Sequence, residues 1–163
     1  MTGKVLIFTV ILLSALVARV PAGESFSGTV RKVIDGDSLL IAAGKKTVEV
    51  RLYGVDCPEY NQPFSPQAKA LVRTSVAGKK VLVRPLYHDS YNRLVAIVVY
   101  GDKILNGELV RAGLAWVYPR YCRKKICKTW QEMENSAKND KRGMWRSTAP
   151  IPPWQWKRMK RGK

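Results

Sequence analysis

The chain has 163 residues, a length typical of one domain with a short tail and too short for two full domains. Its hydrophobic and charged fractions, 46% and 25%, are near the globular average and exclude a wholly disordered chain. With 29 Lys and Arg against 12 acidic residues the formal charge is +17, which favours a polyanionic partner, and the single histidine excludes a multi-histidine metal centre.

The first 22 residues differ in composition from the rest. Lys4 precedes Val5–Val17, a 13-residue run without charge. That run is shorter than the roughly 20 apolar residues of a spanning helix, and Val20-Pro21-Ala22 then resembles a cleavage site before Gly23. We interpret residues 1–22 as a signal peptide, the alternatives being an uncleaved anchor or a buried core strand. The mature chain would keep a charge of +15, because the leader holds two basic residues and no acidic one.

Strand signals follow from residue 26 to residue 56. Val48, Val50 and Leu52 alternate with polar residues, the period-two pattern of a half-buried strand, which puts Arg51 on the polar face. Turn signals at Asp35-Gly36-Asp37 and at Gly44 divide this segment into strands over 29–34, 39–42 and 47–52. Further strands are predicted over 80–86, 93–100 and 103–105.

Three helices are predicted between and after these strands. Their signals are Ser65 as an N-cap before Pro66 with a stop at Gly78, Asn106 as the N-cap of a short helix ending at Gly113, and a capping box at Thr129–Glu132 opening a helix that ends at Gly143. The first helix would bury Ala68, Leu71, Val72 and Val76, and the last would bury Trp130, Met133 and Ala137.

The order of elements predicts an α+β fold, a five-stranded OB-type β-barrel with about three packed helices, over residues 23–146. Periodicity alone allows another α+β arrangement. Residues 147–163 form a basic tail with prolines and tryptophans, and no acidic residue occurs from Lys141 onward. This tail either packs on its own domain or is an electrostatic arm for nucleic acid.

The three cysteines are too few for a disulfide-stapled mini-protein. In an oxidising compartment Cys122 and Cys127 could close a small loop, which leaves Cys57 unpaired. Cys57 is interpreted as a small buried hydrophobe, the alternative being a nucleophile with His88 as its base.

Acidic and basic residues then recur in four short segments, which hold Asp35 and Asp37, Arg51 to Glu59, Asp89 to Arg93, and Asn106 to Ala115. Each has an ordinary explanation alone, such as a hairpin turn or a surface ion pair between Arg93 and Asp89. Together, Asp37 followed by Arg51-x4-Asp56-x2-Glu59 and then Arg93 resembles the thermonuclease family of secreted, staphylococcal-nuclease-like phosphodiesterases. The resemblance runs from about Ser27 to Trp145, and the tail and the Cys122/Cys127 pair resemble exported Gram-negative members.

The resemblance implies a role for each matching position. Calcium ligands fall on Asp37, Asp56 and the backbone carbonyl of Cys57, with Asp35 behind them. The proposed general base falls on Glu59, the phosphate-clamping arginines on Arg51 and Arg93, and the tyrosines of the nucleotide site on Tyr91 and Tyr118. Tyr91 has core packing beside the hairpin as its alternative.

These residue types suit phosphodiester hydrolysis. Two carboxylates and a carbonyl form a hard-oxygen site for Ca²⁺. The planar forks of two arginines match the equatorial phosphoryl oxygens, where negative charge grows in the transition state.

The sequence therefore predicts a periplasmic or secreted, monomeric, calcium-dependent nuclease that cuts DNA and RNA with little sequence preference. The resemblance implies 3′-phosphate and 5′-hydroxyl ends and no stable membrane association after leader removal. Two alternatives are a non-catalytic OB-fold nucleic-acid-binding module and a basic protein that binds anionic lipid or polysaccharide. The second of these leaves the three acids Asp37, Asp56 and Glu59 unexplained.

Overall fold

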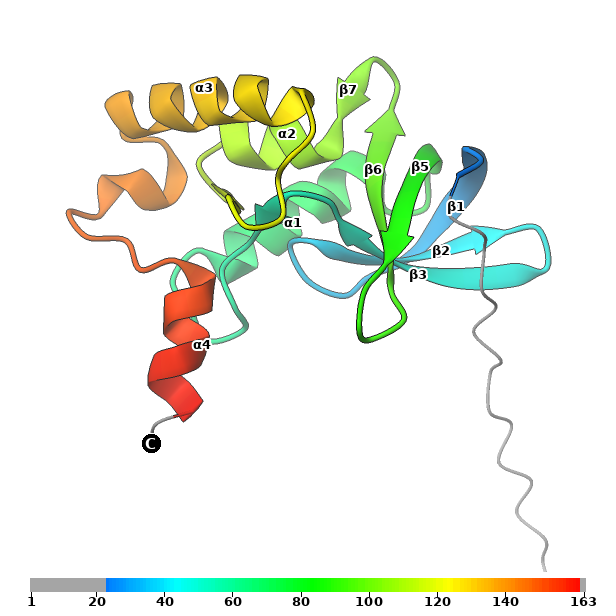
Figure 1. Ribbon diagram of the computed structural model, residues 1–163, viewed down its shortest axis with the longest axis horizontal. Helices are drawn as coiled ribbons and strands as arrows, with labels where there is room; N and C mark the ends of the chain where they lie inside the picture. Colours follow the sequence, from blue (N-terminus) through cyan, green and yellow to red (C-terminus); the bar gives the residue numbers. More distant parts are fainter. Residues whose placement is uncertain (1–22, 162–163) are drawn as a thin grey trace, which may run out of the picture.

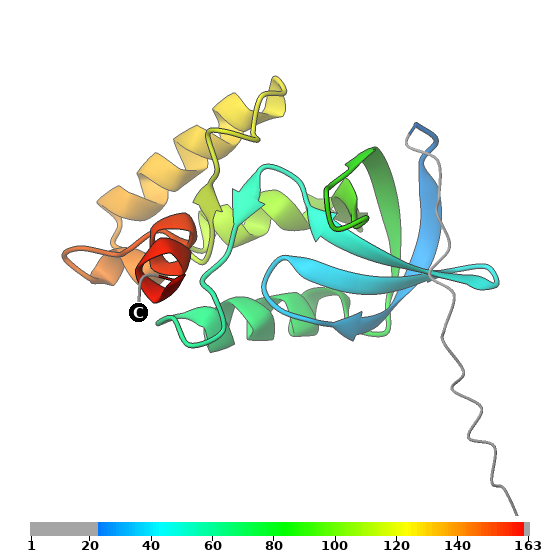
Figure 2. The same cartoon turned by 60° about the horizontal axis from the view of Figure 1, so that its bottom comes forward.

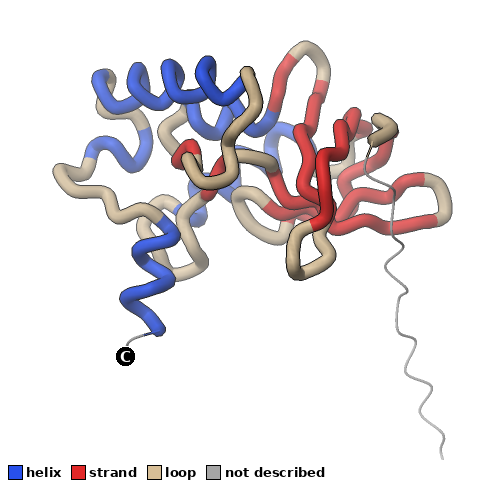
Figure 3. The backbone as a smooth tube through the Cα atoms, in the orientation of Figure 1, coloured by secondary structure: helices blue, strands red, loops and turns tan. Residues whose placement is uncertain are grey.

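The computed structural model describes residues 23–161, so the predicted signal peptide lies outside the described residues. Strands gather on one side of the domain and most helices on the other (Figures 1 and 3). The strands are β1 (Phe26–Val33), β2 (Ser38–Ala43), β3 (Lys46–Leu52), β4 (Val55–Asp56), β5 (Lys80–His88), β6 (Leu94–Tyr100), β7 (Lys103–Ile104) and β8 (Trp116–Val117).

Five of these strands close into the barrel that the sequence predicts. The sheet order is β3-β2-β1-β5-β6-β7, and a parallel pairing of β3 with β6 joins the two sides. The alternation in β3 buries Val48, Val50 and Leu52, so Arg51 points out of the core at the strand's end. The predicted α+β OB-type architecture is confirmed.

Within residues 23–161, four α-helices and one 3₁₀ helix pack against the barrel, most of them on one side: α1 (Ser65–Val76), α2 (Leu105–Arg111), α3 (Ile126–Asn139), the 3₁₀ helix η1 (Gly143–Arg146) and α4 (Pro153–Arg161). Ala68, Val72 and Val76 of α1 are buried as predicted, and Leu71 is half-buried. Among residues 23–161 no helix is long and apolar enough to cross a membrane.

The predicted helix starts are wrong in all three cases. Ser65 is the first helical residue of α1, because Phe64, with a left-handed φ of 69°, is the N-cap. The box at Thr129–Glu132 lies inside α3, which begins three residues earlier and ends before Gly143. Asn106 lies inside α2, whose N-cap is Ile104.

Asn106 has a tertiary role that a cap would not have. Its side chain is fully buried, accepts the N–H of Val98 at 3.1 Å, and donates to the carbonyl oxygens of Tyr53 at 3.0 Å and Ala96 at 3.3 Å. It thereby fixes α2 to β6 and to the turn after β3, the turn that follows Arg51.

The tail folds as well. Helix α4 lies beside the loop that leads into α1 (Figure 2). Gln62 of that loop donates to the carbonyl oxygen of Ile151 at 2.5 Å, and Pro153 at the start of α4 is buried. The C-terminal segment therefore packs on its own domain.

Candidate active site

A cavity of about 510 Å³ opens at the end of the barrel where β3 ends and β6 begins. Its walls come from the β3–β4 turn, the β5–β6 hairpin, the loop between β8 and α3, and α4. The charged and aromatic residues that line it are Arg51, Arg93, Lys157, Arg158 and Arg161, then Asp56 and Asp89, then Tyr87, Tyr91, Tyr118, Tyr121 and Trp154. Cations outnumber carboxylates, so the cavity suits an anion that also has aromatic parts.

Arg51 joins two carboxylates, of which Asp56 lines the cavity with it and Asp37 lies behind. One guanidinium nitrogen contacts Oδ1 of Asp37, and the other lies 2.5 Å from Oδ1 of Asp56. Asp37 comes from the turn between β1 and β2, Arg51 from β3 and Asp56 from β4, so three segments of the first part of the barrel meet here. The structure brings together the arginine and the two acids that the sequence placed in one site.

Hydrogen bonds hold both the backbone and the carboxylate of Asp37. Asp35 Oδ1 accepts the N–H of Asp37 at 2.9 Å, and the N–H of Cys57 donates to Asp37 Oδ2 at 2.6 Å. Asp35 thus shapes the turn that carries Asp37 and does not itself line the cavity.

The Asp56 carboxylate has an oxygen that calls for a cation. Asp56 is buried, and its Oδ2 has no hydrogen-bond partner among the described residues. Burial raises the pKa of Asp56 above its ordinary value of 3.8, although Arg51 and Lys157 act in the opposite direction. An uncompensated buried carboxylate oxygen is costly, and a bound cation would satisfy it.

The residues present fit a calcium ion. In residues 23–161 no three Asp, Glu, His or Cys side chains cluster closely enough to hold a metal by themselves. A cation here would therefore take its ligands from Asp37, Asp56, a backbone oxygen and water, a hard-oxygen set of the kind that calcium accepts.

Cys57 is a buried, free cysteine, 2% exposed. Burial raises its pKa well above the ordinary value of 9.0, so the thiol stays protonated at neutral pH. This environment excludes the nucleophile alternative and confirms the expectation of a small buried side chain.

Arg93 is held by Asp89 within the β5–β6 hairpin. Its Nε lies 2.8 Å and one of its terminal nitrogens 2.7 Å from Asp89 Oδ2. The ion pair weighed from the sequence therefore exists, and Arg93 still lines the cavity together with Arg51. Tyr91 beside it is 75% exposed, which excludes core packing.

Glu59 lies at the margin and makes an unexpected pair. Its Oε1 is 2.9 Å from Nζ of Lys157, both side chains being more than a third exposed. Glu59 does not line the cavity itself, whereas Lys157 does. The predicted base and a cation from the C-terminal helix thus share one edge of the site.

Tyr118, predicted to line the nucleotide site, lines the cavity but is covered on one face. Trp154 of α4 stacks on it with ring centroids 4.6 Å apart and planes at 6°. Tyr121 meets it edge-on at 4.9 Å. The stack fastens α4 to the loop after β8.

Sequence reasoning missed the contribution of α4 and of Tyr87 and Tyr121. Pro153 is a good first residue for a helix, and tryptophans at 154 and 156 are consistent with a helix that packs on the domain. Nothing local to residues 153–161 indicates that Lys157 meets Glu59.

Two comparisons bear on this geometry. A family model described as staphylococcal nuclease homologue matches residues 49–147. That range holds Arg51, Asp56, Glu59 and Arg93, whereas Asp37 and α4 lie outside it.

Relatives that match over most of their own length agree with the family match. A protein of Escherichia coli O157:H7 named uncharacterized endonuclease is 35% identical over 134 residues, which are 82% of this chain and 86% of that protein. A protein of the same name from Haemophilus influenzae is 31% identical over 162 residues, 99% of this chain and 89% of the other. A micrococcal nuclease of Shigella flexneri is 29% identical over 152 residues, covering 88% and 87%.

Proposed function

The chain belongs to the staphylococcal nuclease family of phosphodiester-hydrolysing enzymes, and from that premise we propose an exported, calcium-dependent nuclease. Its substrates are DNA and RNA, cut with little sequence preference. The products carry 3′-phosphate and 5′-hydroxyl ends.

The observation that carries this proposal is the meeting of Arg51 and Arg93 on one cavity beside the unsatisfied oxygen of Asp56. A phosphodiester is an anion whose negative charge grows on the equatorial oxygens as a nucleophile attacks. Two guanidinium groups fixed before the reaction stabilise that charge without having to reorganise.

Each arginine is held in place by acids that a substrate must partly replace. Arg51 has Asp37 and Asp56, and Arg93 has Asp89. These contacts order the side chains, so less rotamer entropy is lost when a phosphate binds. Calcium held by Asp37, Asp56 and the Cys57 carbonyl would polarise a phosphoryl oxygen and add positive charge.

Glu59 is the proposed general base. A water that attacks phosphorus loses a proton, and a carboxylate at the cavity edge can accept it. Lys157 must first release Glu59. Because both side chains are more than a third exposed, parting the pair costs at most about 1 kcal/mol, and a substrate phosphate offers Lys157 another anion.

The leader supports export. Residues 1–22 have the composition of a signal peptide, and the Cys122–Cys127 disulfide suits an oxidising compartment such as the periplasm. We propose that the mature enzyme begins at Gly23, acts as a monomer and has no stable membrane association.

The test is cleavage of plasmid DNA and of a single-stranded RNA with calcium or with a chelator. We expect fragments only with calcium, and direct phosphorylation of their 5′ ends by a polynucleotide kinase, which needs a free 5′-hydroxyl. Arg51→Lys and Arg93→Lys, which keep the charge and lose the planar fork, should each slow single-turnover cleavage about 100-fold.

Arg84→Lys is the matched control, since Arg84 is exposed on β5 and does not line the cavity. Binding of DNA without any cleavage in calcium would support the rival, a non-catalytic nucleic-acid-binding module.

A further inference from the structure

A second cavity of about 480 Å³ adjoins the first. It is lined by Tyr53, Tyr87, Arg120, Tyr121, Arg123 and Lys124. Tyr87 and Tyr121 line both cavities, so the two share a wall. A strand that leaves the first cavity past these tyrosines would enter the second.

The basic side chains of the second cavity have no acidic partners among the described residues. Its lining contains three basic residues and, within the described part of the chain, no carboxylate. None of the salt bridges found among residues 23–161 involves Arg120, Arg123 or Lys124, and all three side chains are exposed. Such a patch attracts phosphates, and the exposed rings of Tyr87 and Tyr121 offer stacking surfaces for unpaired bases.

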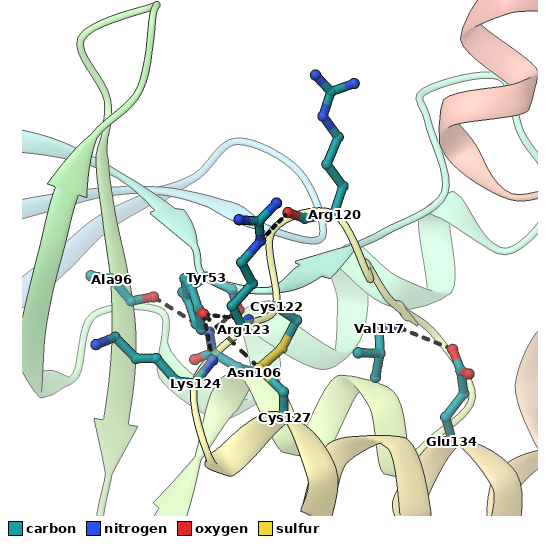
Figure 4. The surroundings of a disulfide bond; sticks show 10 residues. All are labelled: Tyr53, Ala96, Asn106, Val117, Arg120, Cys122, Arg123, Lys124, Cys127 and Glu134. Atoms are coloured by element: carbon teal, nitrogen blue, oxygen red, sulfur yellow. Dashed lines mark hydrogen bonds between the residues drawn. A yellow bond between two sulfur atoms is a disulfide. The ribbon is translucent and has the colours of Figure 1, made fainter.

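The loop that carries these cations is fixed in shape. The Cys122–Cys127 disulfide ties it to the start of α3, and the hydroxyl of Tyr53 accepts the N–H groups of Arg123 at 2.8 Å and Lys124 at 3.1 Å (Figure 4). Arg123 also donates from Nε to the carbonyl oxygen of Arg120 at 3.2 Å, and the two guanidinium groups project to the same side of the loop, away from α3 (Figure 4).

The same loop is fastened to the turn that follows Arg51. The N–H of Tyr118 donates to the carbonyl oxygen of Gly54 at 2.9 Å. Gly54 has a φ of 70°, and a Cβ there would lie 2.5 Å from the sulfur of Cys122. The disulfide therefore packs directly on the backbone beside the candidate active site.

We propose that this disulfide-locked loop is a second substrate subsite. It binds the phosphates and unpaired bases of the nucleic-acid strand that extends from the cleaved bond. The inference rests on the proposed function, because it takes the occupant of the second cavity to be the continuation of the strand in the first. Its consequence is a preference for strands long enough to reach both cavities.

The test compares a dinucleotide with a twelve-nucleotide single strand. The variant is Arg120→Gln/Arg123→Gln/Lys124→Gln. The control is Lys45→Gln/Lys46→Gln/Lys80→Gln, which removes the same charge from exposed positions at the other end of the barrel, where β2 turns into β3 and β5 begins.

For the loop variant we expect KM for the long strand to rise about tenfold and kcat to stay unchanged, with dinucleotide cleavage unaffected. Loss of three contacts should lower the slope of log Kd against log salt by about 2, since each phosphate contributes roughly 0.7 on a single strand. The control should show less than half of either effect. An equal loss on both substrates, or an equal loss in the control, would overturn the subsite.

Binding of the long strand is also measured by fluorescence anisotropy in chelator, where nothing is cut. That arm separates the two proposals, because a chain that never cleaves refutes the nuclease while the anisotropy still decides the subsite. Tyr53→Phe keeps every charge and removes the hydroxyl that holds the loop. This variant should weaken binding of the long strand about threefold and leave cleavage of the dinucleotide unchanged. Equal effects on the two substrates would contradict the role of the locked loop.

Discussion

Glu59 shows how one residue is shared between two tasks. In the free protein its carboxylate pairs with Lys157, and in the reaction we expect it to accept a proton. Glu59→Gln keeps the size of the side chain and its ability to hydrogen-bond, but an amide does not take up a proton. Single-turnover cleavage should fall by roughly 10² to 10⁴, with DNA affinity close to that of the parent.

The matched control is Glu132→Gln, an exposed position on α3. Rapid-quench cleavage at saturating DNA and calcium is the measurement. Near-normal cleavage by the Glu59 variant would remove Glu59 as the base.

The ionisation of Asp89 should make the stability of the fold depend on pH. Burial would raise its pKa, but the hydrogen bonds from the side chain and backbone of Arg93 outweigh burial and hold the pKa below the ordinary 3.8. A carboxyl whose pKa is lower in the folded state stabilises the fold above its unfolded pKa, and this contribution is lost as pH falls through the folded pKa.

Asp89→Asn should therefore lower the free energy of unfolding by about 1–2 kcal/mol at pH 7 and pH 5, and by much less at pH 2.5. Urea unfolding at the three pH values measures this. Asp102→Asn, an exposed aspartate in the β6–β7 turn, should change little throughout. A difference for Asp89→Asn that persists undiminished at pH 2.5 would contradict the assignment.

At the scale of elements, the barrel strands were predictable because their signal is local. Alternation in β3 and turn residues at Gly44 and Gly101 are visible within a few residues of each strand. β4 and β8, two residues each, exist only because they pair with one another across the chain. The predictions of the helix starts were wrong because they also depend on distant contacts. In the sequence alone, a polar residue at a helix cap cannot be told from one inside a packed helix.

The candidate site divides in the same way. Asp37, Arg51, Asp56 and Arg93 were placed together by their order along the chain, through the family resemblance. The contacts of α4 were not, because the pairing of Lys157 with Glu59 and of Trp154 with Tyr118 depends on where the last helix docks.

Asn106 is the clearest case of an element held by one side chain. Replacing it with Ala leaves the N–H of Val98 and the carbonyls of Tyr53 and Ala96 without this partner in a dry interior. We expect a loss of about 3 kcal/mol in the free energy of unfolding, measured by urea. Asn139→Ala, at the exposed end of α3, should lose under about 0.5 kcal/mol. A comparable loss in both variants would refute the bridging role.

Helix α4 contributes charge to the cavity as well as covering Tyr118. Deleting residues 157–163 removes Lys157, Arg158 and Arg161 from the lining. The slope of log Kd against log salt for duplex DNA should fall by about 2–3, and KM should rise. The deletion also breaks the ion pair of Lys157 with Glu59, so the truncated enzyme shows the effect of lost charge and of a freed Glu59 together. The single variant Lys157→Gln breaks the pair but keeps Arg158 and Arg161, and thereby separates the two effects. An unchanged salt slope would mean that α4 lies outside the path of the substrate.

At the scale of the whole molecule, many of the basic side chains gather around the two cavities. The two cavities share a wall and together are lined by eight of the basic side chains. The two acids that line the first cavity, Asp56 and Asp89, each pair with an arginine, and Asp56 keeps one oxygen that a cation could bind. We expect the net charge to attract polyanions to the surface and the paired acids to restrict where a phosphate binds tightly.

Calcium should therefore stabilise the whole fold as well as support cleavage. A ligand that binds only the folded state at 100 times its Kd adds about 2.7 kcal/mol, which for a domain of this size raises Tm by about 5–10 °C. Asp37→Asn and Asp56→Asn should lose most of that rise, because each removes the negative charge and one oxygen of a carboxylate ligand, whereas Arg93→Lys should keep it. Thermal unfolding with and without calcium, and no DNA, measures the site independently of activity. An equal rise in the parent and in both aspartate variants would place the calcium elsewhere on the molecule.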